Sequence, residues 1–237
     1  MSEQIPRELA ENLAAYRSSD AVASLSVYRL YPEEEQLITR YYKFGDSILD
    51  LACGMGRTTL LLHEMGFAVR GVDRSDVFIQ LAKQRLPYLD LRVGSYDRIE
   101  EPDASFQHVL ISLNGIDYAF PAVQRMQALK ECARVLKPGG TFIFCSHNLK
   151  SMHLLSPYYW NRKRWKLKNC LQAFKDCAYI KEEGVHAYYA PPKIILCQIE
   201  SVDLKLMEMQ WFPKYGIERL DRYFSPYVYY VCTKPGN

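Results

Sequence analysis

Short apolar segments alternate along the chain with segments in which apolar residues recur every three or four positions. The apolar segments, each the length of a buried strand, are residues 47–51, 68–72, 89–93, 108–113 and 141–146. Helical spacing follows the first, second and fourth of them, over about 57–65, 77–86 and 126–136. This order predicts an α/β fold with a parallel sheet, which binds ligands at the carboxyl ends of its strands.

The flanking segments have different patterns. Residues 1–44 are expected to be mostly helical, with a helix start at Pro32, because proline and the following acids suit a first turn. Residues 149–190 form an aromatic and basic insertion, which we expect to be largely helical. A helix over about 193–200 and strands over 204–211 and 227–232 complete a single domain, divided at 1–44, 45–148, 149–190 and 191–237.

Composition narrows the possible classes. At 237 residues the chain can bury one α/β core, and its net charge of +3 argues against a dedicated nucleic-acid binder. None of its seven cysteines is spaced as CxxC, so we expect free thiols and no metal site. The first residues lack an apolar leader and no run of about 18 apolar residues occurs, so a cytoplasmic location without membrane association is expected.

The turn after the first strand carries the first functional signal. A dinucleotide fingerprint, GxGxxG, would begin at Gly54 and Gly56 and place its third glycine at residue 59, which is a threonine. A nicotinamide-dependent oxidoreductase is therefore the least favoured class. What the turn does contain is an acid at the strand end followed by small residues, at Asp50, Ala52, Gly54 and Gly56.

These residues resemble the first motif of the class I S-adenosylmethionine-dependent methyltransferases, with alanine in place of the first glycine. A second resemblance lies in RVLKPGG, residues 134–140, before an apolar strand. Matching positions span about 48–148. The resemblance implies a Rossmann-like, seven-stranded, mostly parallel sheet of order 3-2-1-4-5-7-6 with an antiparallel last strand, S-adenosylmethionine as cofactor, and residues 1–44 and 149–190 as covers of the site.

The resemblance also implies where the cofactor binds. Glycines let the backbone approach a ligand closely, and Asp73, at the end of the second strand, can accept hydrogen bonds from both ribose hydroxyls. Ser95 stands where the family commonly has an acid that contacts the adenine amino group, and its hydroxyl can still accept such a bond. The full set expected at the cofactor is Asp50, Ala52, Gly54, Gly56, Asp73, Arg74, Ser95, Tyr96, Leu113 and Asn114. Tyr96 is equally compatible with ordinary packing.

Polar residues after the fourth and fifth strands are candidates for the acceptor side. His147 is a candidate general base, because an imidazole can take up a proton near neutral pH. Asp117 and Tyr118 are the other catalytic candidates. A histidine at a strand end is also often just hydrogen-bonded to a neighbouring loop, so both interpretations stay open.

The expected reaction is methyl transfer to oxygen or nitrogen of a small metabolite, natural product or sugar derivative. Two alternatives remain. The interleaved aromatic and basic residues of the insertion, from Tyr158 to Lys168, suit an RNA-modifying enzyme or an anionic small acceptor, and they equally suit a solvated helix. A protein that binds the cofactor without catalysis would carry the same motifs.

Overall fold

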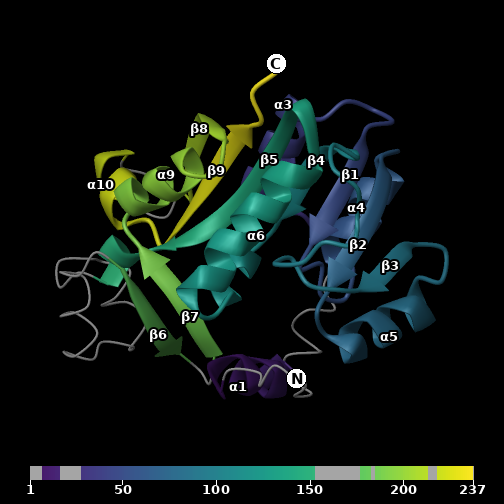
Figure 1. Ribbon diagram of the computed structural model, residues 1–237, viewed down its shortest axis with the longest axis horizontal. Helices are drawn as coiled ribbons and strands as arrows, with labels where there is room; N and C mark the ends of the chain where they lie inside the picture. Colours follow the sequence, from purple (N-terminus) through teal and green to yellow (C-terminus); the bar gives the residue numbers. More distant parts are fainter. Residues whose placement is uncertain (1–6, 17–27, 153–176, 183–184, 213–217, 237) are drawn as a thin grey trace.

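The computed structural model describes residues 7–16, 28–152, 177–182, 185–212 and 218–236. Within them, one nine-stranded sheet carries helices on both faces (Figure 1). The strands are β1 Ser47–Leu51, β2 Ala68–Asp73, β3 Asp90–Val93, β4 Phe106–Ile111, β5 Leu136–Asn148, β6 Ala178–Glu182, β7 Val185–Ala190, β8 Lys205–Trp211 and β9 Tyr227–Thr233. The helices are α1 Arg7–Tyr16, α3 Pro32–Tyr41, α4 Arg57–Glu64, α5 Asp76–Arg85, α6 Ala122–Val135, α9 Pro192–Glu200 and α10 Glu218–Phe224, with 3-10 turns η1 Gly115–Tyr118 and η2 Leu149–Met152.

The strand order confirms the predicted fold. Strands β3, β2, β1, β4 and β5 are parallel neighbours, and the last strand, β9, lies antiparallel between β5 and β8. We expected seven strands, and the sheet has nine within the described residues. Strand β7 pairs with the end of β5, His147 opposite Tyr189, and β6 pairs with β7.

In the described part of the insertion, two strands stand where helix was expected; residues 153–176 lie outside the described residues. Of that insertion, 149–152 form η2 and the part from Ala178 onward forms β6 and β7. In β7 the sequence VHAYYA contains a valine and two tyrosines, which favour extended backbone. The basic and aromatic stretch from 158 to 168 lies outside the described residues.

The turn predicted before the fifth strand is part of that strand. Strand β5 begins at Leu136, opposite Phe106, and the pairing register shifts before His108. Gly139 takes φ +77°, which a glycine adopts without strain. The KPGG segment is therefore an irregularity at the start of a long strand and not a separate connection.

Alternate residues of the central strands enter two different cores. Toward α6 and α9, in front of the sheet in Figure 1, point Leu49, Leu51, Val109, Ile111, Phe142 and Phe144. Toward α3 and α4 point Ile48, Leu110, Ile143 and Cys145, with Leu37, Ile38 and Leu62 from the helices. Both faces are covered, which explains why these strands read as continuous apolar runs.

A close contact in β2 explains how the helix after the first turn packs without the third glycine of a dinucleotide fingerprint. Thr59, which occupies that position in α4, faces Gly71 of β2, and a Cβ built on Gly71 would lie 2.6 Å from Thr59 Oγ1 and 2.7 Å from Leu91 Cδ2. The close packing that a glycine in the helix would allow is here allowed by Gly71 in the strand. This leaves room for a threonine hydroxyl beside β1.

Replacing Gly71 by alanine is expected to lower the free energy of unfolding by about 1–3 kcal/mol, because the new methyl group overpacks this contact. Urea unfolding measures the change. Gly236→Ala is the matched control, since a Cβ there meets nothing within 4 Å. Equal stability of the two variants would contradict the account of the packing.

Candidate functional site

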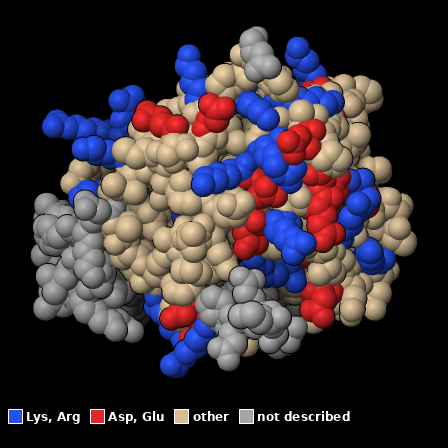
Figure 2. Space-filling view, in the orientation of Figure 1, with Lys and Arg blue, Asp and Glu red and all other residues tan. Residues whose placement is uncertain are grey.

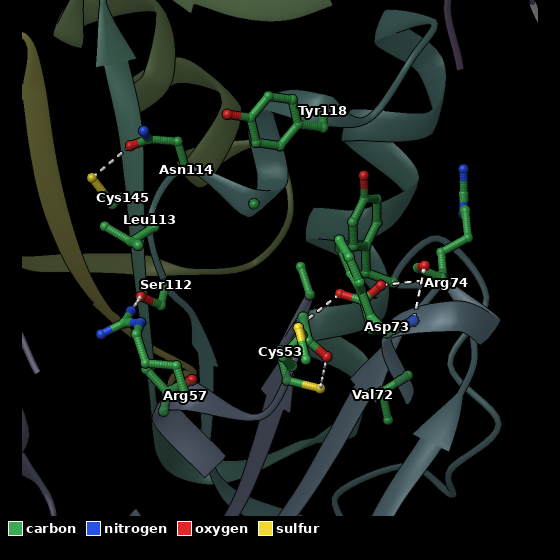
Figure 3. A pocket seen from close by; sticks show the side chains of 18 of the residues that line it. Cys53, Arg57, Val72, Asp73, Arg74, Ser112, Leu113, Asn114, Tyr118 and Cys145 are labelled. Atoms are coloured by element: carbon green, nitrogen blue, oxygen red, sulfur yellow. Dashed lines mark hydrogen bonds between the residues drawn. The ribbon is translucent and has the colours of Figure 1, made fainter. Parts of the chain in front are cut away.

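A cavity of about 500 Å³ opens at the carboxyl ends of β1, β2 and β4. Figure 3 shows its two sides: Val72 and Asp73 end β2 and Arg74 follows it, and Ser112, Leu113 and Asn114 follow β4. Cys53 lies between them in the turn after β1. Such a volume is typical of small-molecule sites.

The turn after β1 has left-handed backbone at three places. Gly54 and Gly56 take φ +57° and +81°, and Ala52 takes +55°. A Cβ built on Gly54 meets no atom within 4 Å, so this glycine leaves open space at the cavity wall. Leu113 and Asn114, at the end of β4, take φ +44° and +62°. At the non-glycine residues Ala52, Leu113 and Asn114, left-handed backbone is strained. Such strain typically costs about 1–3 kcal/mol per residue and concentrates at functional sites.

Asp73 is held in place by the turn that it faces. Its Oδ2 accepts a hydrogen bond from the Gly54 amide and its Oδ1 accepts one from the Ser75 amide, both at 2.8 Å. Each oxygen keeps a further lone pair, which is the arrangement that a pair of neighbouring hydroxyls requires. Burial raises the pKa of Asp73, against the lowering effect of the two amides.

Asp50 lies behind the turn and is fully buried. Its Oδ2 accepts hydrogen bonds from the hydroxyls of Thr58, at 2.5 Å, and Thr59, at 2.6 Å. Its Oδ1 has no partner among the described residues. Burial raises the pKa of Asp50 to about 6, although both threonine hydroxyls lower it.

This raised pKa predicts a pH dependence that Asp50→Asn removes. The pKa of Asp50 in the folded protein lies above its usual 3.8, so folding favours the uncharged form. The stabilisation is complete below pH 3.8 and is lost as the pH rises through 6, a change of about 3 kcal/mol. The free energy of unfolding of Asp50→Asn minus that of wild type should therefore increase by most of this amount, about 2.4 kcal/mol, between pH 4 and pH 7. A constant difference would contradict the prediction.

Arg74 and its neighbours form the far end of the cavity. The Arg74 guanidinium lies over the Tyr96 ring, 5.5 Å from its centroid, and donates to Asp97 at 2.8 Å. Ser95 Oγ bonds both Arg74 and Asp97. The Ser95 hydroxyl is thus engaged with these side chains, and Ser95 does not line the cavity. Arg74 Nη1 is buried without a partner among the described residues.

Arg57, the first residue of α4, joins the glycine turn to the amino-terminal cap. It forms two hydrogen bonds with Glu34 of α3, at 2.8 and 3.0 Å, and also bonds Ser112. Its guanidinium lies 5.3 Å from the centroid of the Tyr31 ring. Glu34 is nearly inaccessible, so this is a buried, bidentate ion pair.

A second buried cluster lies behind Asn114. Asp117 Oδ2 accepts hydrogen bonds from His147 Nδ1 and from the His147 amide, each at 2.7 Å. Its other oxygen accepts from Arg125 Nη1 at 2.6 Å and from Ser146 at 2.7 Å. Arg125 is fully buried and also lies over the Tyr188 ring. Asp117 therefore carries a compensated charge and fixes the imidazole from one side.

These contacts assign the histidine tautomer. Because Asp117 accepts at every contact, Nδ1 of His147 carries a proton, and Nε2 presents a lone pair. Nε2 lies 3.4 Å from the Asn114 amide nitrogen, which donates toward it. Asn114 and Tyr118 line the cavity, so the acceptor nitrogen of this imidazole lies directly behind the wall.

Helix α1 closes the cavity from outside the sheet. Asn12 lines the cavity, and its side chain donates to the His186 carbonyl at 2.8 Å and accepts from the His186 amide at 2.7 Å. Glu11 bonds His186 and Lys181 of the β6–β7 hairpin. The Asn12 side-chain amide thus pairs with the backbone of β7 as a neighbouring strand would. This contact joins the amino-terminal cap to the insertion.

The structure brings together most of the residues singled out from the sequence. Lining the cavity are Ala52, Gly54, Asp73, Arg74, Tyr96, Leu113, Asn114 and Tyr118. Behind its wall lie Asp50, Gly56, Asp117 and His147, and Ser95 lies beside Arg74. Sequence reasoning missed the aromatic residues at the other end of the cavity, namely Tyr31, Phe212, Tyr227 and Tyr229.

The visible surface over β2 and β3 mixes both signs of charge (Figure 2). Arg70 and Arg92 pair with Asp90 and Glu101, at 2.6 to 3.5 Å. Because two acids balance these two arginines, this cluster has little net positive charge to attract phosphates. No helix among the described residues has the length and apolar character needed to cross a membrane.

Comparisons with known proteins agree with this geometry. Residues 48–140 match a family model described as a methyltransferase domain. The putative methyltransferase YqeM of Bacillus subtilis is 34% identical over 105 residues, 43% of this chain and 42% of the relative. A demethylmenaquinone methyltransferase of Symbiobacterium thermophilum is 33% identical over 152 residues, 60% of this chain and 58% of the relative. The chain thus spans about half the length of these curated relatives.

A solved structure extends the likeness of the fold beyond that domain. A SAM-dependent methyltransferase of Methanosarcina mazei aligns with a TM-score of 0.66 over 88% of this chain and 99% of its own, at 18% identity. At this identity the comparison concerns the fold alone.

Proposed function

We propose that this chain, whose residues 48–140 match a methyltransferase domain, is a class I S-adenosylmethionine-dependent methyltransferase that methylates an oxygen or nitrogen of a small molecule. One observation carries this proposal. A single cavity of about 500 Å³ joins the Asp73 carboxylate, whose remaining lone pairs could hold a diol, to an end lined with aromatic side chains, with the imidazole of His147 behind its wall. This arrangement suits a small amphipathic acceptor, since the rings supply apolar area.

The residues present fit the cofactor. Asp73 would hold the ribose hydroxyls through its remaining lone pairs, and Arg74 with Tyr96 would border the adenine. The turn from Ala52 to Gly54 leaves room for the rest of the molecule, and Asp50 Oδ1 offers an unsatisfied acceptor behind it. When bound, S-adenosylmethionine supplies a methyl group on a positively charged sulfur. An acceptor lone pair can take this methyl group, with the sulfur as leaving group.

In the proposed reaction His147 removes the acceptor's proton. The acceptor oxygen or nitrogen would take the methyl group that the bound cofactor supplies, leaving its sulfur uncharged. For the released proton to reach Nε2 of His147, the Asn114 amide that donates toward Nε2 must turn aside. Asp117 then holds Nδ1 and stabilises the imidazolium. The cavity aligns the two reactants, which supplies much of the remaining rate.

The names of relatives support a small acceptor. Several are demethylmenaquinone methyltransferases, and that name denotes a small-molecule substrate. The RNA alternative depends on the segment from 158 to 168, which lies outside the described residues.

The test uses methyl-labelled S-adenosylmethionine and an extract of source cells divided by size. Label in the small fraction supports the proposal and provides the product for identification. Label confined to the large fraction and lost after ribonuclease treatment would replace it with RNA methylation. Binding of the cofactor without transfer to either fraction would favour a non-catalytic role.

A further inference from the structure

A buried pair of opposite charges lies behind the wall of the cavity. Arg125 of α6 and Asp117 of η1 are both 0% exposed, and Arg125 Nη1 donates to Asp117 Oδ1 at 2.6 Å. Neither is among the described residues that line the cavity. Removing two charges from water is costly, and apolar side chains of similar volume are often at least as stabilising. The pair therefore calls for a reason beyond stability.

Further contacts fix the guanidinium of Arg125 beside this carboxylate. Nη1 also donates to the Ile116 carbonyl at 3.1 Å, and Nη2 donates to Ser146 Oγ at 3.3 Å. Nε donates to Gln198 of α9 at 3.1 Å, and the guanidinium carbon lies 4.5 Å from the centroid of the Tyr188 ring of β7. Because partners on η1, β5, β7 and α9 hold the guanidinium, its positive charge stays at the carboxylate.

The same carboxylate holds the imidazole of His147. Asp117 Oδ2 accepts the proton of His147 Nδ1 at 2.7 Å, while Oδ1 accepts from Arg125. With a neutral imidazole the guanidinium and the carboxylate balance, since arginine stays charged in proteins. A proton on Nε2 would add an uncompensated positive charge to a buried cluster. Without Arg125, the same proton would neutralise the charge of Asp117 and would be favoured.

The other side chains that contact the imidazole do not alter this balance. The ring centroids of Tyr189 in β7 and Tyr227 in β9 lie 4.4 and 5.3 Å from that of His147. Phenols are uncharged at neutral pH, and the Asn114 amide that faces Nε2 has no charge. Within the described contacts of this cluster, the charge balance therefore depends on Asp117 and Arg125.

We propose that Arg125 is a positioning residue for the methyl transfer: acting through Asp117, it keeps Nε2 of His147 free of a proton before the acceptor arrives. The inference rests on the proposed function, in which this nitrogen is the base. An arginine that only joined α6 to β7 and α9 would leave the charge state of the imidazole unaltered.

The test follows the imidazole directly, by nitrogen-15 NMR of histidine-labelled protein saturated with S-adenosylhomocysteine. The shifts of the ring nitrogens distinguish a charged from a neutral imidazole, and His147→Gln identifies the signals of His147. Wild type should be neutral at pH 7, with the proton on Nδ1. Arg125→Gln can still donate a hydrogen bond but has no charge, so it should raise the ratio of charged to neutral His147 about tenfold or more.

Two variants are the controls. Arg125→Lys keeps the charge and should leave the ratio close to that of wild type. Arg134→Gln should do the same, because Arg134 lies on the same helix but pairs with Glu131 and Asp103 nearer the surface. An unchanged ratio in Arg125→Gln, an equal rise in Arg125→Lys, or a charged imidazole in wild type would overturn the proposal.

A second pair of variants applies if Arg125→Gln does not fold. Asp117→Asn is then compared with the double variant that also carries Arg125→Met and buries no ion pair. The ratio of charged to neutral His147 should rise about tenfold or more from the single to the double variant. Equal ratios in the two would contradict the role of Arg125.

Separate readouts test the proposed function. If wild type does not bind S-adenosylhomocysteine in calorimetry, the cofactor assignment fails and the proposal fails with it. If His147→Gln keeps the wild-type kcat with the acceptor identified by labelling, the base and the role of Arg125 in the reaction both fail. A lower kcat in His147→Gln together with an unchanged ratio in Arg125→Gln rejects the role of Arg125 alone.

Discussion

Replacing His147 by glutamine should lower kcat by about 10²- to 10⁴-fold, the range typical of a lost general base. Glutamine keeps the size and polarity of the side chain but cannot take a proton. The dissociation constant of S-adenosylmethionine should change less than twofold, because His147 lies behind the acceptor side of the cavity. Single-turnover rates with the identified acceptor and calorimetry with the cofactor measure the two quantities.

The matched control is His108→Gln. His108 also bonds an acid, Asp46, at 2.8 Å, but it does so near the amino end of β4, away from the cavity. Its folded variant should retain the wild-type kcat. An unchanged kcat in His147→Gln would show that no base is needed and would leave positioning as the contribution of this cluster.

The second large effect is expected on the cofactor itself. Asp73→Ala should weaken S-adenosylmethionine binding at least about tenfold, since each hydrogen bond to a charged acceptor contributes about 1.5–3 kcal/mol. Part of the loss would come from the glycine turn, because Asp73 also accepts the Gly54 amide. Asp73→Asn separates the two contributions, as its amide oxygen can still accept that bond.

Asp76→Asn, three residues further on and exposed, serves as the control for charge alone. Calorimetric affinities equal for Asp73→Ala and wild type would remove Asp73 from the cofactor site. A loss in the alanine variant that the asparagine variant fully restores would limit Asp73 to holding the turn.

The core of the fold could be predicted because its strands are buried on both faces. In β1, β4 and β5 the buried apolar residues alternate between two cores, so the strands are largely apolar runs with visible ends. The hairpin of β6 and β7 was missed for the opposite reason. Those strands lie at the end of the sheet, and residues such as Lys181 and His186 interrupt the apolar pattern.

Site residues at the ends of parallel strands could be predicted from the sequence, whereas residues placed by irregular turns could not. Asp73, Gly54 and Asn114 lie at strand ends, so their convergence follows from a parallel sheet. The bond between Asp117 and His147 depends on a 3-10 turn and on the backbone of Asn114, which no local pattern encodes. Tyr227 and Tyr229 could have been found, because an antiparallel last strand begins at the edge where the parallel strands end.

The two ends of the cavity come from different parts of the chain. Residues that fit the cofactor lie within 48–140, whereas the aromatic residues Tyr31, Phe212, Tyr227 and Tyr229 lie outside it. If these aromatic residues contact the acceptor, as proposed, the acceptor end can change in sequence without any change in residues 48–140. On that proposal, protein engineers could vary acceptor preference at these four side chains and leave the residues that fit the cofactor intact.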